Sequence, residues 1–152
     1  MGILIQGGRV VDAASQMDKI ADVYLDDGVI QEIGEKLKVK DKDDRIIDAR
    51  GMVVMPGLVD LHVHFRDPGQ TEKEDIESGS KAAARGGVTT VVAMPNTTPV
   101  IDCPDRANYV KNKAAQVSPI HVLQAGAMTK GELGCELSDI AGMAAAGVPV
   151  LS

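Results

Sequence analysis

Short apolar stretches rich in β-branched residues, separated by glycine-containing turns, make up the first third of the chain. They occupy residues 3–6, 9–11, 22–25, 29–33 and 45–48. Asp26-Asp27-Gly28 stands between two of these stretches, and an Asp-Gly pair supplies the positive φ angles that a tight hairpin turn needs. The pattern predicts that residues 1–53 form a small β-sheet module.

Beyond Val53 the pattern changes to apolar runs that alternate with helical segments. We expect strands over residues 53–65, 88–94, 120–124 and 148–151, and helices over residues 71–85, 102–116 and 137–146. Repeated strand–helix units predict a parallel sheet with right-handed crossovers. A doubly wound sheet and an eight-stranded (β/α)8 barrel both have this pattern, but no Gly-x-Gly-x-x-Gly or Walker sequence supports a nucleotide-binding sheet.

The ends of these helices carry recognisable signals. Thr71 and Glu74 have the spacing of a capping box at the start of the first helix, and Gly86-Gly87 ends it. Asp102, with Pro104 in the first turn, is the expected N-cap of the second helix.

Charged residues on these helices have ordinary structural explanations. The helix macrodipole favours acidic residues at a helix N-terminus, which accounts for Glu72, Glu74, Asp75 and Glu77 without catalysis. We expect Arg85, Lys111 and Lys113 to lie on solvated helix faces.

The number of strand–helix units bears on domain organisation. Residues 54–152 supply three complete units and the start of a fourth, whereas a closed barrel has eight strands. An isolated half-barrel would leave an open apolar edge. We therefore expect more polypeptide after Ser152, or a second chain, to complete the fold.

Composition and charge exclude several functions. The formal net charge is −6, which disfavours nucleic acid and anionic membrane surfaces as partners. No apolar run approaches the length of a membrane span, and the start has no secretion signal. Cys103 and Cys135 lack metal-type spacing, so we expect free thiols in a cytoplasmic protein.

The segment around His62 carries the most specific chemistry. Residues two apart on a strand share a face, so His62, His64 and Arg66 would point to one side if the strand extends that far. Two imidazoles on one face can chelate a cation such as zinc. A His-x-His pair alone is more often two ordinary histidines, but here it ends an apolar strand and is followed by an arginine. These features favour a metal site.

Other polar residues near the predicted strand ends are less specific. Asn96, directly after the strand over 88–94, is either a simple turn residue or, together with Arg66, part of a clamp for a substrate carboxylate. Asp60 either orients a histidine ligand or pairs with a buried cation. His121 begins its strand, which is the wrong end for a barrel-mouth ligand, so we interpret it as structural.

Two segments together resemble a known protein family. Residues 56–69 (PGLVDLHVHFRDPG) and 94–99 (MPNTTP), together with residues 74–79, 82–92 and 126–131, closely resemble the bacterial, barrel-type dihydroorotases of the amidohydrolase superfamily. The resemblance covers essentially the whole chain and is most specific in the first two segments.

The resemblance implies a fold and a site. It implies a partial (β/α)8 TIM barrel over residues 54–152, preceded over residues 1–53 by part of a small β-sandwich domain. It places His62 and His64 as ligands of one or two zinc ions, and Arg66 and Asn96 as the residues that hold the substrate carboxylate.

The resemblance also implies a reaction, the reversible cyclisation of N-carbamoyl-L-aspartate to L-dihydroorotate in pyrimidine biosynthesis. In the opening direction a metal-bound hydroxide attacks the amide carbonyl. No residue of this chain matches the remaining metal ligands or the general acid/base, so residues 1–152 alone are expected to be inactive. The candidate protein partners are a second copy in a homodimer and aspartate transcarbamoylase.

Three alternatives stay open from the sequence. A hydantoinase or allantoinase would share the fold and the histidine pair. A non-catalytic dihydroorotase-like subunit would instead scaffold aspartate transcarbamoylase. A truncated product would have no function of its own.

Overall fold

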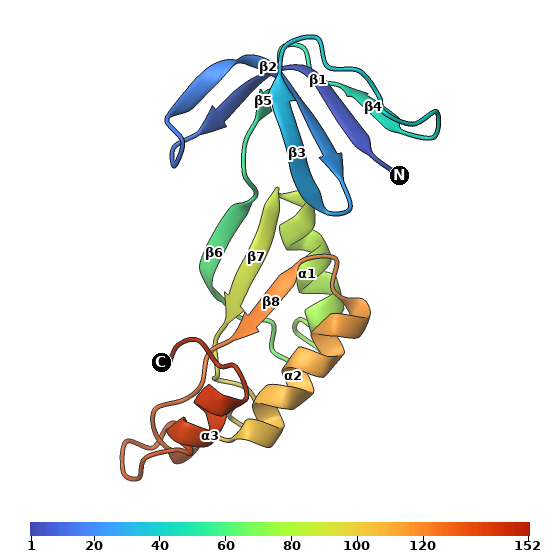
Figure 1. Ribbon diagram of the computed structural model, residues 1–152. Helices are drawn as coiled ribbons and strands as arrows, with labels where there is room; N and C mark the ends of the chain where they lie inside the picture. The colour runs from blue at the N-terminus through green and yellow to red at the C-terminus, as the bar shows by residue number, and fades with distance from the viewer. The chain divides into compact units, whose positions relative to one another are not determined.

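The computed structural model describes residues 1–152, which divide into two units, Met1–Pro56 and Gly57–Ser152 (Figure 1). The first unit contains only strands, and the second combines strands with helices. Each unit has its own buried apolar cluster. The chain is therefore a mixed α/β protein.

The first unit is a five-stranded sheet built around its first strand. Its strands are β1 (Ile3–Asp12), β2 (Met17–Asp26), β3 (Val29–Gly34), β4 (Arg45–Asp48) and β5 (Val53–Val54). Antiparallel pairing gives the order β3-β2-β1, and both β4 and β5 pair with β1 in parallel. The predicted hairpin is confirmed, because Asp26 pairs with Val29 and both Asp27 and Gly28 have positive φ angles.

A β-bulge joins the two stretches predicted as separate strands into β1. The register with β2 shifts between Ile5 and Gly8, and Gly7 adopts a φ of 72°. The buried carboxylate of Asp22 accepts hydrogen bonds from the backbone amides of Gly7 (2.8 Å) and Leu37 (2.9 Å). This carboxylate fixes both the bulge and the loop after β3.

The second unit contains a parallel sheet with the strand order β6-β7-β8. These strands are β6 (Leu58–Val63), β7 (Val88–Ala93) and β8 (His121–Gln124), and the helices are α1 (Ile76–Arg85), α2 (Pro104–Val117), the 3₁₀ turn η1 (Lys130–Glu132) and α3 (Ile140–Ala145). Helix α1 packs against β7 and α2, and α2 packs against β8. None of the helices has the length and apolarity that a bilayer crossing requires.

The core of the second unit is aliphatic apart from Phe65. Ile76, Val91, Ile101 and Val110 are at most 1% exposed and pack around Phe65. The strand predicted over 88–94 is confirmed, and its carboxyl-terminal half is buried. Burial of β-branched residues from a central parallel strand stabilises this layer.

Two predicted helix starts are wrong. The N-cap of α1 is Asp75, not Thr71, because the Asp75 carboxylate accepts the Ser78 amide (2.7 Å) and Ser78 completes a capping box. The N-cap of α2 is Cys103, since Asp102 instead pairs with Arg106 and accepts the Gly131 amide.

The last predicted elements are shorter than expected. Helix α3 begins at Ile140 because the Asp139 carboxylate accepts the Gly142 amide (2.9 Å) and serves as N-cap. The strand predicted over 148–151 is reduced to one parallel bridge between Leu151 and Gly126.

The loops that follow β6 and β7 are joined by hydrogen bonds. The Thr98 amide donates to the Pro68 carbonyl (3.1 Å), and the Gln70 side-chain amide donates to the Thr98 hydroxyl (3.1 Å). Gly69, with a φ of 85°, lies so close that an added Cβ would be 1.7 Å from the Thr98 carbonyl oxygen. Only glycine fits where these two loops meet.

The Asp44 carboxylate makes the first unit sensitive to acid. It accepts hydrogen bonds from the Gly2 amide (2.7 Å) and the Tyr24 hydroxyl (2.8 Å). It also accepts the amides of Lys40 and Asp41 (both 2.9 Å), and these bonds, that of Asp41 foremost, lower the pKa of Asp44 from 3.8 to about 2. A lowered folded-state pKa gives stability that is present above the unfolded pKa and lost as the pH falls through the folded pKa.

We expect Asp44→Asn to lower the free energy of unfolding at pH 7, and this deficit to shrink as the pH falls from about 4 to about 2. Urea unfolding followed by circular dichroism at a series of pH values measures it. Asp43→Asn, whose carboxylate accepts no hydrogen bond, is the matched control. A deficit that stays constant with pH would contradict this assignment.

Gly69 offers a test of the contact between the two loops. Gly87 has nearly the same φ, 83°, but no atom near an added Cβ, so Gly87→Ala costs only the backbone strain, about 1 kcal/mol. Gly69→Ala adds a steric clash and should cost about 3 kcal/mol or more. Thermal unfolding of the two variants separates the backbone strain from the steric clash. Equal losses of stability would show that the two loops move apart to accommodate the added Cβ.

Candidate functional site

The candidate site lies where neighbouring parallel strands end. His62 is in β6, His64 follows its last residue, and Asn96 follows β7. The Met94 amide donates to the Val63 carbonyl (2.9 Å), which brings the two strand ends together. Strand β6 ends at Val63, however, and Arg66 has a φ of 60°. The alternation that would place Arg66 on the histidine face therefore does not extend to Arg66.

The two histidines lie next to each other. Their ring centroids are 5.1 Å apart and the rings are inclined at 68°. The His64 Nδ1 atom is 2.8 Å from the Asn96 Oδ1 atom. An amide oxygen can only accept, so Nδ1 is the donor in this hydrogen bond, and in the neutral imidazole the lone pair then lies on Nε2. Asn96 thus fixes the tautomer in which Nε2 is free to bind a metal.

Two side-chain donors in the loops after β6 and β7 have no protein partner. Arg66 is half-buried and its guanidinium makes no ion pair or hydrogen bond within the chain. The Asn96 Nδ2 group likewise donates to no protein atom, although its Oδ1 is engaged by His64. A guanidinium and an amide donor that are both free, in two loops joined by the hydrogen bond between Thr98 and Pro68, suit an anionic oxygen ligand.

The chain brings together two histidines and no larger group of metal ligands. No group of three or more His, Cys, Asp or Glu side chains comes together. Asp60 is exposed, and its carboxylate accepts the backbone amide of His62 (3.1 Å). His121 is the first residue of β8, as expected, at the strand end away from the site. Cys103 and Cys135 are free thiols, as predicted.

The structure adds three residues that the sequence did not single out for this site. Asp67 follows Arg66 and is buried, with Tyr109 and Lys113 of α2 at its carboxylate. The prediction that Lys113 lies on a solvated helix face is wrong for this reason. One signal was available: Tyr109 and Lys113 are four apart on a predicted helix and so share a face.

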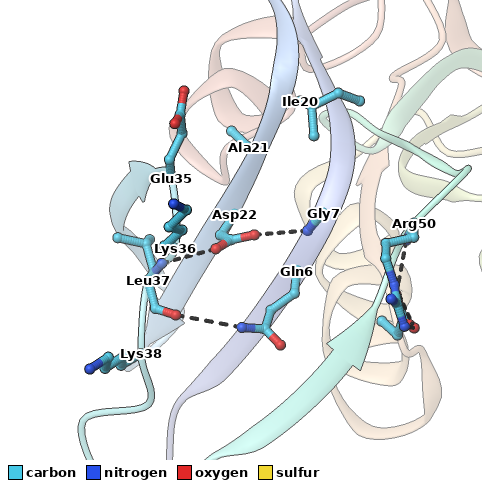
Figure 2. A pocket seen from close by; sticks show the side chains of 11 residues that line it. Gln6, Gly7, Ile20, Ala21, Asp22, Glu35, Lys36, Leu37, Lys38 and Arg50 are labelled. Atoms are coloured by element: carbon cyan, nitrogen blue, oxygen red, sulfur yellow. Dashed lines mark hydrogen bonds and ion pairs between the residues drawn. The ribbon is translucent and has the colours of Figure 1, made fainter.

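A hollow in the first unit is a structural feature rather than a second site. Figure 2 shows Asp22 in this hollow, hydrogen-bonded to Gly7 and Leu37, with Lys36 and Arg50 among the residues that line it. Both Asp22 oxygens are engaged by backbone amides, and Arg50 is paired with Asp48 (2.6 Å). No buried polar group there is left without a partner to bind a ligand.

Comparison with known sequences identifies relatives. The family described as "Dihydro-orotase-like" matches residues 51–152. The dihydroorotase of Clostridioides difficile (strain 630) is 55% identical over 147 residues, which cover 97% of this chain and 34% of that protein. The dihydroorotase of Aquifex aeolicus (strain VF5) is 43% identical over 145 residues, covering 95% and 34%. The chain spans about a third of the length of the curated relatives it matches.

Solved structures give a consistent result. The L-hydantoinase (dihydropyrimidinase) of Arthrobacter aurescens superposes with a TM-score of 0.82 at 30% identity, covering 98% of this chain and 32% of that one. A D-hydantoinase of Thermus sp. superposes with a TM-score of 0.70 at 31% identity, covering 84% and 28%. Since the family match covers well over half of the residues, the chain belongs to the dihydro-orotase-like family.

Proposed function

We propose that the protein to which this chain belongs is a dihydroorotase, which interconverts N-carbamoyl-L-aspartate and L-dihydroorotate in a zinc-dependent reaction. The observation that carries the proposal is that two free donors, on Arg66 and Asn96, lie in the hydrogen-bonded loops that follow the two strands of the site, and that Asn96 contacts the histidine pair. Both the substrate and the product of this reaction carry a carboxylate that such donors recognise. The names of the curated relatives support the same activity.

The proposed architecture follows the same family. Residues 54–152 would form the first part of a (β/α)8 barrel, and residues 1–53 part of a small β-sandwich domain. The barrel is supported by parallel strands that neighbour one another in chain order and are connected by helices, as β6-α1-β7-α2-β8. In a barrel, the carboxyl ends of the strands are where active sites lie, and His62, His64 and Asn96 are all found at such ends.

The histidine pair fits a zinc ion. His62 and His64 present adjacent imidazoles, and the Asn96 bond leaves Nε2 of His64 available as a ligand atom. These two residues would hold the metal from this chain. Zinc, when bound, polarises the scissile amide carbonyl and lowers the pKa of a water molecule.

The remaining steps concern binding and orientation. The Arg66 guanidinium pairs with the substrate carboxylate through charged hydrogen bonds, and Asn96 Nδ2 donates a further one. Asn96 thereby contacts the metal ligand through its oxygen and the substrate through its nitrogen, which couples the position of the carboxylate to that of His64. Holding the substrate in this way aligns its amide for hydrolysis.

A second candidate function is a hydantoinase-type amidohydrolase, which the superposition on L-hydantoinase favours. Hydantoin has no carboxylate for Arg66 to bind. Relative rates of the full protein on dihydroorotate, hydantoin and allantoin distinguish the two proposals, and faster turnover of hydantoin would favour the second.

A homodimer and a complex with aspartate transcarbamoylase are the proposed assemblies. A non-catalytic role in the complex with aspartate transcarbamoylase would leave the protein without zinc.

Arg66→Ala should raise KM for dihydroorotate about 10- to 100-fold, because a charged hydrogen bond contributes roughly 1.5–3 kcal/mol. Steady-state kinetics of the full protein measure this. Arg85→Ala, on the exposed end of α1, is the control and should leave KM unchanged. An unchanged KM in Arg66→Ala would refute the carboxylate clamp.

His62→Ala should remove most of the bound zinc from the full protein, because one of only two ligands that this chain supplies is lost. Elemental analysis after dialysis against a chelator measures the content independently of turnover. His121→Ala is the matched control and should retain zinc. Zinc retained by the His62→Ala variant would disprove the assignment of His62 as a ligand.

We also expect residues 1–152 alone to show no turnover of dihydroorotate.

A further inference from the structure

Asp67 is a buried carboxylate in the loop that carries Arg66. Its side chain is 1% exposed. The Tyr109 hydroxyl donates to its Oδ1 atom (3.1 Å), and the Lys113 Nζ atom lies 2.6 Å from its Oδ2 atom. The contact with the Asp67 carboxylate raises the pKa of Lys113. Both partners come from α2, so the carboxylate ties this loop to the helix.

Stability alone is a weak reason for such a pair. Removing a carboxylate and an ammonium from water costs free energy that their attraction repays only in part. An apolar pair of similar volume would hold the loop against α2 at least as well. What the ionic pair adds is a fixed charge arrangement next to the half-buried Arg66, one residue away in the chain.

The arrangement leaves Arg66 unpaired. Tyr109 donates to one oxygen of Asp67 and the Lys113 ammonium lies against the other, so the charge of the carboxylate is compensated without the neighbouring guanidinium. Without Lys113, the buried charge would need another cation, and Arg66 is the nearest along the chain. Lys113 therefore keeps the Arg66 guanidinium unpaired and also holds its loop in place.

The same loop is held on its other side by the loop after β7. Thr98 donates to the Pro68 carbonyl, and Gly69 is in close contact with the Thr98 backbone. Residues 67–69 are thus fixed between α2 and the segment that carries Asn96. A binding group fixed on both sides loses little conformational entropy when its ligand arrives.

We propose that Asp67, Tyr109 and Lys113 form a buried anchor that positions Arg66 and keeps its guanidinium free for the substrate carboxylate. The inference rests on the proposed function for the identity of that carboxylate. None of the three touches substrate in this scheme. They are positioning residues, and their loss acts through Arg66.

The test uses the full protein with Lys113→Met, which keeps the length of the side chain and removes its charge. We expect KM for dihydroorotate to rise about tenfold, with kcat within about twofold of wild type and zinc content unchanged. Lys111→Met, on the exposed face of the same helix, is the matched control and should leave KM as it is. An unchanged KM in Lys113→Met, or an equal rise in both variants, would overturn the anchor.

A second readout does not depend on turnover. Phenylglyoxal modifies accessible arginines, and peptide mass spectrometry gives the rate at Arg66 relative to the exposed Arg85. We expect Lys113→Met to slow modification of Arg66 at least about threefold, as Asp67 recruits the guanidinium, and Asp67→Asn/Lys113→Met to restore the wild-type rate. Equal rates in all three proteins would refute the anchor.

The two readouts also separate the anchor from the proposed function. A wild-type protein that does not turn over dihydroorotate would defeat the proposed function, and the modification rates would still decide for or against the anchor. Should Lys113→Met fail to fold, Tyr109→Phe removes only one hydrogen-bond donor from a half-exposed side chain. It should raise KM about two- to threefold, and an unchanged KM would count against the anchor.

Discussion

Backbone pairing between β6 and β7 places the ends of two apolar strands side by side, and the polar groups of the candidate site extend from those ends. The Met94 amide donates to the Val63 carbonyl at the last step of this pairing. One residue further along β6 lies His64, and two residues further along β7 lies Asn96, which explains their hydrogen bond. A register shifted by one residue would turn one side chain away and break it.

Local neutralisation of buried carboxylates is the second organising feature. Asp22 is bound by two backbone amides, and Asp67 by a hydroxyl and an ammonium. Arg66 differs from these buried carboxylates, because its half-buried charge has no partner of opposite charge within the chain. An uncompensated, half-buried guanidinium costs free energy in the folded protein. A ligand carboxylate would recover that cost, and this links stability to binding.

Parts of this structure follow from local sequence and parts do not. Strand β7 and the Asp27-Gly28 hairpin were predictable, because a β-branched run and a positive-φ pair each specify one conformation. The start of α1 was not, because Thr71 and Asp75 are both suitable N-caps, and it is Asp75 whose carboxylate accepts the Ser78 amide. His62, His64, Arg66 and Asn96 could be selected from sequence. The ion pair of Lys113 spans 46 positions, and the spacing of Tyr109 and Lys113 on one helix face does not identify Asp67 as their partner.

The exposed side chains of β6 connect the fold to the chemistry. Leu58, Val59 and Leu61 are 48–70% exposed, although strands of parallel sheets are normally covered on both faces. β6 has a strand partner on only one edge. In the proposed barrel, further strands and helices would cover these side chains, and the carboxyl ends of those strands would reach the mouth where His62 and His64 lie. Closure of the barrel and completion of the metal site would then be one structural event, because the same strand–helix units would bring both the missing apolar cover and the missing ligands.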